Sequence, residues 1–108
     1  MGQSLVAAPA FDRDALPAPV LAFATKEQLL PHLEHAASLA DSLLRPSRQL
    51  IFELETDPES DEQRLIVDAP LDCGVDEALV RNGAFTRAWV SATPPGVRDK
   101  IRVLYHLA

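Results

Sequence analysis

The stretch that decides the fold is RQLIFELETDPESDEQRLIVDAP, residues 48–70. Two runs of alternating apolar and polar residues flank a polar break at 57–62. Alternation with a period of two is typical of strands that bury one face, and Asp-Pro is a strong turn initiator. The stretch therefore predicts a β-hairpin with an acidic tip.

The register of this hairpin follows if Thr56 faces Gln63. A slip of one residue would set apolar beside polar side chains throughout, so the alternation specifies which face is buried, while a slip of two residues would keep the same alternation. An opposite-charge pair across the strands supports the same register on the outer face. The expected partners are Leu54 with Leu65, Phe52 with Val67 and Leu50 with Ala69 on the buried face, and Glu55 with Arg64 on the outer face.

Two helices are predicted around the hairpin. The pattern T-K-E-Q at 25–28 is a capping box, and apolar residues at helical spacing follow it, which predicts a helix over 26–44 ended by Arg45-Pro46. Pro31 either kinks this helix or lies in the first turn of its regular part. An apolar stripe that includes Phe85 and Trp89 predicts a second helix over 75–91, stopped by Pro-Pro-Gly at 94–96.

A third strand is predicted at 101–107, where apolar and polar residues alternate again. The element order is then α-β-β-α-β, an α+β fold. Setting the last strand beside the first gives a three-stranded antiparallel sheet of order 2-1-3, with two helices packed on one face. The Ala- and Pro-rich residues 1–24 are predicted to form an irregular arm, and residues 25–108 a single domain.

Three apolar residues do not fit a sheet whose second face is in water. Ile51, Ile66 and Leu104 alternate onto the face opposite the helices, where polar residues are expected. Either the arm or a second copy of the chain would cover them. These three residues are therefore a possible homodimer face.

Charge is concentrated in one part of the chain. The net charge is −6, yet residues 53–77 hold ten acidic residues and a single base, Arg64. Phosphate groups would be repelled there, so the composition argues against a nucleic-acid partner and favours a protein partner with a basic surface. The predicted partner-binding residues are Glu53, Glu55, Asp57, Glu59, Asp61 and Glu62.

Compartment and anchoring follow from a few simple features. Cys73 is the only cysteine, so no disulfide can form within the chain, which is typical of a reducing compartment. The first residues lack the basic and apolar regions of a secretory signal, and no apolar run approaches membrane-spanning length. A cytoplasmic location without membrane association is predicted.

Several residue sets contain groups that could carry chemistry, but none has the spacing that a known site requires. The loop 57–62 is rich in oxygen ligands but lacks the glycine and the distant glutamate of a calcium-binding loop. His32 and His35 lie three residues apart rather than four, and a third zinc ligand is missing. Cys73 has no flanking nucleophile signature. We therefore predict no catalytic residue, no metal and no cofactor.

Three segments carry a likeness to known sequences. They are T-D-P-E-S-D at 56–61, Trp89 followed by Pro94, and D-K-I-R-V-L-Y at 99–105. In these segments, which span about residues 50–105, the chain resembles a family of small uncharacterised bacterial proteins. The resemblance implies a similar hairpin tip and terminal strand, and it brings no activity or catalytic residue with it.

The functional prediction is a small acidic interaction protein, more in keeping with a binding role than with an enzyme. It would bind a basic partner through the hairpin, as an antitoxin- or immunity-like protein does. The alternative is a ligand-binding domain or small enzyme with a pocket between helices and sheet. Its candidate reactive groups would be Cys73, His32 and His106.

Overall fold

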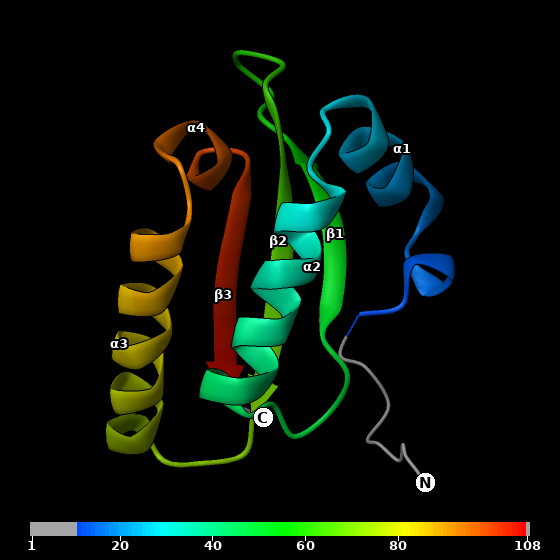
Figure 1. Cartoon of the computed structure of the whole chain (residues 1–108). Helices are drawn as coiled ribbons and strands as arrows, with labels where there is room; N and C mark the ends of the chain where they lie inside the picture. The colour runs from blue at the N-terminus through cyan, green and yellow to red at the C-terminus, as the bar shows by residue number, and fades with distance from the viewer. Residues whose placement is uncertain (1–10, 108) are drawn as a thin grey trace, which may run out of the picture.

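The computed structural model describes residues 11–107, which form a three-stranded sheet covered on one face by helices (Figure 1). One face of the sheet carries the core, and the other face is open. The elements in chain order are the 3-10 turn η1 (Arg13–Ala15), α1 (Ala18–Lys26), α2 (Leu30–Leu39), the π-helix η2 (Ala40–Leu44), β1 (Ile51–Thr56), β2 (Gln63–Leu71), α3 (Val75–Ala92), α4 (Pro95–Arg98) and β3 (Ile101–Leu107).

The strand order corrects the predicted topology. The order is β1-β2-β3, with β1 antiparallel to β2 and β3 parallel to β2. The predicted all-antiparallel sheet of order 2-1-3 is therefore wrong, and the fold is α+β with a mixed sheet. Helix α3 makes the crossover between the two parallel strands, and its hand is the usual right-handed one.

The physical reason is that β2, not β1, has the composition of a central strand. Its residues Leu65–Val67 and Ala69–Leu71 are buried almost without interruption, whereas Glu53 and Glu55 of β1 point into water. A strand with a neighbour on each edge is shielded even on the open face, whereas charged residues are common on edge strands. In addition, α1 packs on β1, so the N-terminal segment occupies the side of the sheet that the prediction gave to β3.

The predicted hairpin register is confirmed over the length of β1. Thr56 pairs with Gln63, Glu55 with Arg64, and the two apolar pairs on the buried face follow in order. The regular ladder begins at Ile51, so the expected pair of Leu50 with Ala69 lies beyond it. Alternation therefore predicted the buried face, and the pair of Glu55 with Arg64 supported the register that the structure has.

The core lies between the sheet and the helices α1, α2, η2 and α3. Phe85 and Trp89 of α3 stack with ring centroids 6.3 Å apart, which confirms that this apolar stripe is core. Helix α3 is the longest, with 18 residues. None of the described helices is both long and apolar enough to cross a bilayer. The largest fully buried side chains are Leu33, Leu44, Leu65, Leu71, Ile101, Val20 and Val67.

The N-terminal segment differs from the predicted irregular arm. Residues 18–26 form α1, which buries Val20 and Phe23, while residues 1–10 of the predicted arm lie outside the described part of the chain. Thr25 is consequently inside α1 and does not cap the next helix. Helix α2 starts at Leu30 with Pro31 in its first turn, which is one of the two outcomes expected for that proline.

Candidate functional site

The acidic hairpin tip is closed by its own backbone. The Asp57 N–H donates to the Glu62 carbonyl at 2.8 Å, and the Asp61 N–H donates to the Asp57 carbonyl at 2.8 Å. Asp61 sits at a φ of 62°, in the left-handed region that aspartate tolerates better than most residues. The loop between β1 and β2 is thus a defined turn rather than an open chain.

Asp57 has a structural role within this turn. Its carboxylate accepts a hydrogen bond from the Glu59 N–H at 2.8 Å. This bond, with smaller contributions from Ser60 and Arg64, lowers the pKa of the Asp57 carboxyl below its usual 3.8. The residue therefore remains charged while it holds the turn, and it is a poor choice for substitution in a binding test.

The other predicted partner-binding residues are displayed around the tip. Glu53 and Glu55 lie on the open face of β1, and Glu59, Asp61 and Glu62 are exposed in the loop. Within residues 11–107 only Glu55 of this group makes an ion pair, with Arg64 at 3.5 Å. The hairpin thus presents carboxylates whose charge is largely uncompensated.

A depression beside the tip adds acidic residues that sequence reasoning did not find. It has a volume of about 450 Å³ and lies where the loop meets the end of α1 and the α4–β3 turn. Asp61 and Glu62 line it together with Glu27 and Asp99. Lys100 also lines it, donates to Glu27 and lowers the pKa of that carboxyl below 4.5. No sequence pattern linked these segments, because they are far apart along the chain.

The predicted dimer face is interrupted by charge. Ile51 and Leu104 are each 45% exposed on the open face, whereas Ile66 is only 7% exposed between its neighbouring strands. The register places Asp68 between Ile51 and Leu104 in one row across the sheet. His106 binds the Asp68 carboxylate at 3.0 Å. The three apolar residues are on the predicted face but do not form a continuous patch.

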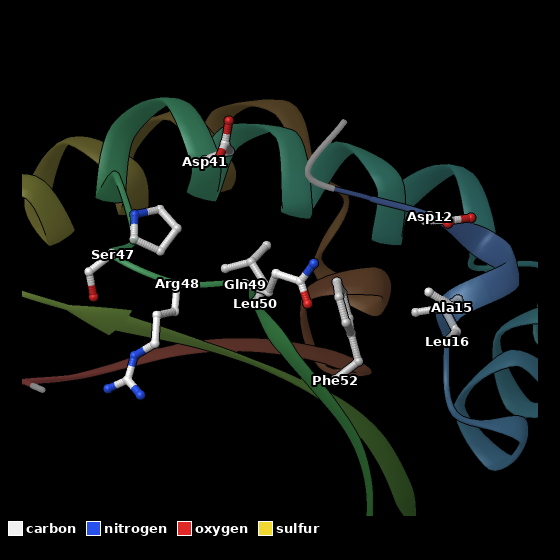
Figure 2. A pocket seen from close by; sticks show the side chains of 10 residues that line it. Asp12, Ala15, Leu16, Asp41, Ser47, Arg48, Gln49, Leu50 and Phe52 are labelled. Carbon is white, nitrogen blue, oxygen red and sulfur yellow. The ribbon is translucent and has the colours of Figure 1, made fainter. Parts of the chain in front are cut away.

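A second hollow lies at the other end of β1, between η1, η2 and the start of the strand (Figure 2). Its volume is about 380 Å³. Leu16, Leu50 and Phe52 supply apolar surface, while the charged residues that line the hollow are Asp12, Asp41 and Arg48. Sequence reasoning missed this cleft, because its walls depend on η1 and on the wide π-helical turn.

The candidate reactive groups of the alternative function are not brought together. His32 lies on α2 in the helical layer, half-buried Cys73 precedes α3, and His106 is on the open face of β3. Of the three, His106 lines a hollow of about 670 Å³ together with Ile51 and Pro70, and neither His32 nor Cys73 belongs to that hollow or to the two described above. In the described part of the chain, no three histidine, cysteine or acidic side chains converge to hold a metal ion.

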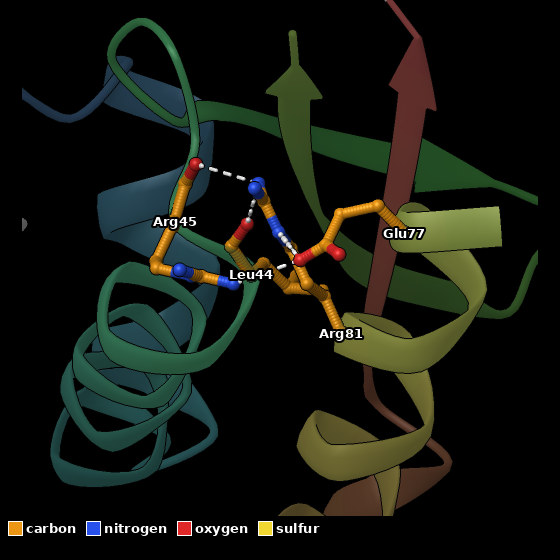
Figure 3. A network of polar contacts seen from close by, with 4 residues as sticks. All are labelled: Leu44, Arg45, Glu77 and Arg81. Atoms are coloured by element: carbon orange, nitrogen blue, oxygen red, sulfur yellow. Dashed lines mark hydrogen bonds and ion pairs between the residues drawn. The ribbon is translucent and has the colours of Figure 1, made fainter. Parts of the chain in front are cut away.

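A polar network joins the end of η2 to the start of α3 (Figure 3). The Arg81 guanidinium donates to the Leu44 carbonyl at 3.2 Å and to the Glu77 carboxylate at 2.9 Å. Arg45, at a φ of 52°, donates to the same carboxylate at 3.0 Å. Arg81 therefore satisfies a helix-end carbonyl and fixes the left-handed turn that follows it. This cluster supports the fold and is not part of the acidic site.

Comparison with known proteins does not add a function. No protein family, curated protein or solved structure matches this chain. The resemblance to small bacterial proteins in the hairpin and the last strand therefore stays a prediction. The geometry of the acidic hairpin is the basis for the functional interpretation.

Proposed function

We propose that this protein is a non-enzymatic interaction module that binds a partner with a basic surface through the acidic end of the β1–β2 hairpin. The observation that carries the proposal is the combination of an acidic tip with a depression in which four carboxylates outnumber two bases; the carboxylates belong to Glu27, Asp61, Glu62 and Asp99, and the bases are Arg64 and Lys100. The depression offers a place for a lysine or arginine side chain of the partner. The exposed carboxylates around it would steer such a surface into place.

The proposal includes the role and location suggested by the sequence. The protein would act as the small acidic member of an antitoxin- or immunity-like pair. It would be a bacterial protein, as the resemblance in the hairpin and the last strand implies. The lone Cys73 is compatible with the cytoplasm. Self-association through Ile51, Ile66 and Leu104 belongs to the same proposal, and light scattering over a range of concentrations tests it.

The test compares two variants that each remove four negative charges. One carries Glu53→Gln, Glu59→Gln, Glu62→Gln and Asp99→Asn, and it leaves Asp57 in place because that side chain holds the turn. It is expected to weaken capture of basic partners from a cell extract about ten-fold or more at low salt, and less at high salt. Quantitative mass spectrometry of the captured proteins gives the ratio to wild type.

The matched control removes the same number of charges from exposed positions away from the tip, with Asp14→Asn, Glu34→Gln, Asp72→Asn and Asp76→Asn. This variant should capture the same proteins as wild type. If both variants lose them equally, only net charge matters and the hairpin is not a site. If neither loses them, the proposed function is wrong.

A second candidate function is favoured by the cleft in Figure 2. Its apolar walls and its two carboxylates, which outnumber the one base, could hold a small cationic molecule, in which case the protein would be a ligand-binding domain. Thermal-shift screening of metabolites separates the two candidates. A ligand whose stabilising effect is lost in Asp41→Asn, and kept in the hairpin variant, would favour the cleft.

A further inference from the structure

Exposed apolar side chains gather at one edge of the molecule. Among the described residues, seven large apolar side chains are exposed, and all except Ile51 belong to α3 or β3. These two elements are adjacent at the left side of Figure 1, where β3 is the last strand of the sheet. The six residues are Val75, Leu79, Val80, Val90, Leu104 and Leu107.

The outer edge of β3 carries backbone groups without a partner in the described part of the chain. The Leu65 N–H donates to the Lys100 carbonyl at 2.7 Å, which fixes the phase of the parallel ladder. The peptide groups of Arg102 and Leu104 accordingly face β2, and those of Val103 and Tyr105 face away from the sheet. Such a row of free donors and acceptors is a template for another strand.

Helix α3 overhangs this edge. In Figure 1 it lies outside β3 and in front of the sheet, and it runs upward from Val75. Its core face carries Phe85 and Trp89, and a stripe of Val75, Leu79 and Val90 lies about a quarter turn further round the helix. Because the helix is right-handed, this stripe faces the sheet plane just beyond β3. A strand added there would meet it.

A glycine in the middle of α3 supports a close approach at the same place. Gly83 follows Leu79 by four residues, so it continues the apolar stripe. A side chain added there would meet only the Arg87 guanidinium, at 3.5 Å, so packing within the fold does not require a glycine. Glycine inside a helix costs stability, and its presence here is explained if another backbone passes near it.

We propose that β3 accepts an extended peptide as a fourth strand beneath α3. This is recognition by β-augmentation, in which backbone hydrogen bonds bind the peptide and alternate side chains give specificity. One set of peptide side chains would face the α3 stripe and would be apolar. The other set would lie along the open face beside Arg102, Leu104 and His106, and its member beside Arg102, which is exposed and makes no ion pair within residues 11–107, would carry a carboxylate. The site is separate from the acidic hairpin.

The geometry argues for a free peptide rather than for a copy of this chain. A two-fold axis that paired β3 with β3 of a second copy would place both overhanging α3 helices over the same two edge strands. The first ten residues of this chain, MGQSLVAAPA, contain no acidic side chain to meet Arg102. A partner segment of alternating apolar and acidic residues meets both requirements.

The experiment uses a fluorescein-labelled peptide, Glu-Val-Glu-Val-Glu-Val-Glu, matched to the seven residues of β3. Fluorescence anisotropy is expected to give a dissociation constant of about 10–100 μM with the full chain. Two further peptides carry N-methyl groups on all valines or on all glutamates. In an added strand, the N–H groups of one set of alternate residues point to β3 and those of the other set point to water. One methylated peptide should therefore fail to bind and the other should bind.

Two matched variants test the contact with α3. Leu79→Gln is expected to weaken peptide binding at least ten-fold, whereas Val80→Gln, at a neighbouring exposed position outside the stripe, should change it less than two-fold. Both positions are exposed, so both variants should keep the wild-type melting temperature within a few degrees. Equal effects of the two variants, or equal binding of the two methylated peptides, would overturn the proposal.

Amide hydrogen exchange provides an independent measurement. In the free protein, the amides of Val103 and Tyr105 should exchange quickly and those of Arg102 and Leu104 slowly. The peptide should slow the first pair. Protection of Val103 and Tyr105 before any peptide is added would mean that the chain itself or a second copy fills the edge, and this would contradict the proposal. Absence of binding at 1 mM peptide, on the order of the weakest useful affinity, would contradict it as well.

Discussion

Replacing Leu44 with alanine is expected to lower the free energy of unfolding by about 2–5 kcal/mol. Leu44 is fully buried at the end of the π-helix η2 and packs in the core between helices and sheet. The backbone is fixed at the C-terminal side of Leu44, because Arg81 donates to the Leu44 carbonyl and Arg45 adopts the left-handed conformation directly afterwards. The site therefore cannot collapse to fill the cavity, which places the expected loss in the upper half of that range.

Urea unfolding followed by circular dichroism measures this loss. Leu43→Ala is the matched control, since Leu43 is the preceding residue but is only half-buried. It should cost less than half as much as Leu44→Ala. A loss below about 1 kcal/mol for Leu44→Ala would show that η2 does not pack as described.

Replacing Arg81 with methionine is expected to cost about 1.5–3 kcal/mol of unfolding free energy. The substitution keeps the unbranched apolar part of the side chain but removes donors to the Leu44 carbonyl, the Arg45 carbonyl and the Glu77 carboxylate. A helix-end carbonyl is then left without its partner in a site where the Arg81 side chain is 16% exposed. Arg87→Met, on the exposed side of the same helix, should change stability by less than about 0.5 kcal/mol.

The same substitution should alter the dependence of stability on pH. The Arg81 hydrogen bond is the largest cause of the lowered pKa of Glu77, whose usual value is 4.5. A lowered folded-state pKa means that the unfolded chain binds more protons, so this stabilisation is present above 4.5 and is lost as the pH falls through the folded value. Urea unfolding between about pH 5 and about pH 3 should show a shallower decline for Arg81→Met than for wild type. An equal decline would mean that Arg81 does not stabilise the Glu77 carboxylate.

The strands could be predicted from the sequence because their signals are local. Alternation in residues 51–56 and 63–71 sets which side chains face the core, and Glu55 opposite Arg64 fixes the register. Strand order is not a local property, because it depends on which strand has a neighbour on each of its two edges. The long apolar run of β2 indicates a central strand, whereas the predicted order 2-1-3 places β2 at the edge of the sheet.

The candidate site was predictable only in part, for a related reason. The acidic loop is contiguous, so its charge is apparent in the sequence. Glu27 and Asp99 join it only because α1 and the α4–β3 turn pack beside the loop. The predicted order 2-1-3 also made β3 an edge strand, but it set β3 beside β1, so it did not place α3 next to the free edge of a parallel β2–β3 pair.

The closed turn at the hairpin tip has a consequence for how a partner would associate. The Glu59 N–H, the Glu62 carbonyl and the carboxylate of Asp57 hold the loop before any encounter takes place. Ordering a flexible loop on binding costs conformational entropy, which weakens affinity and can slow association. In this protein the loop is already ordered before binding, so that cost does not arise when the partner arrives. Capture through the tip should accordingly proceed as fast as collisions and ionic strength allow, with no rearrangement step to limit it.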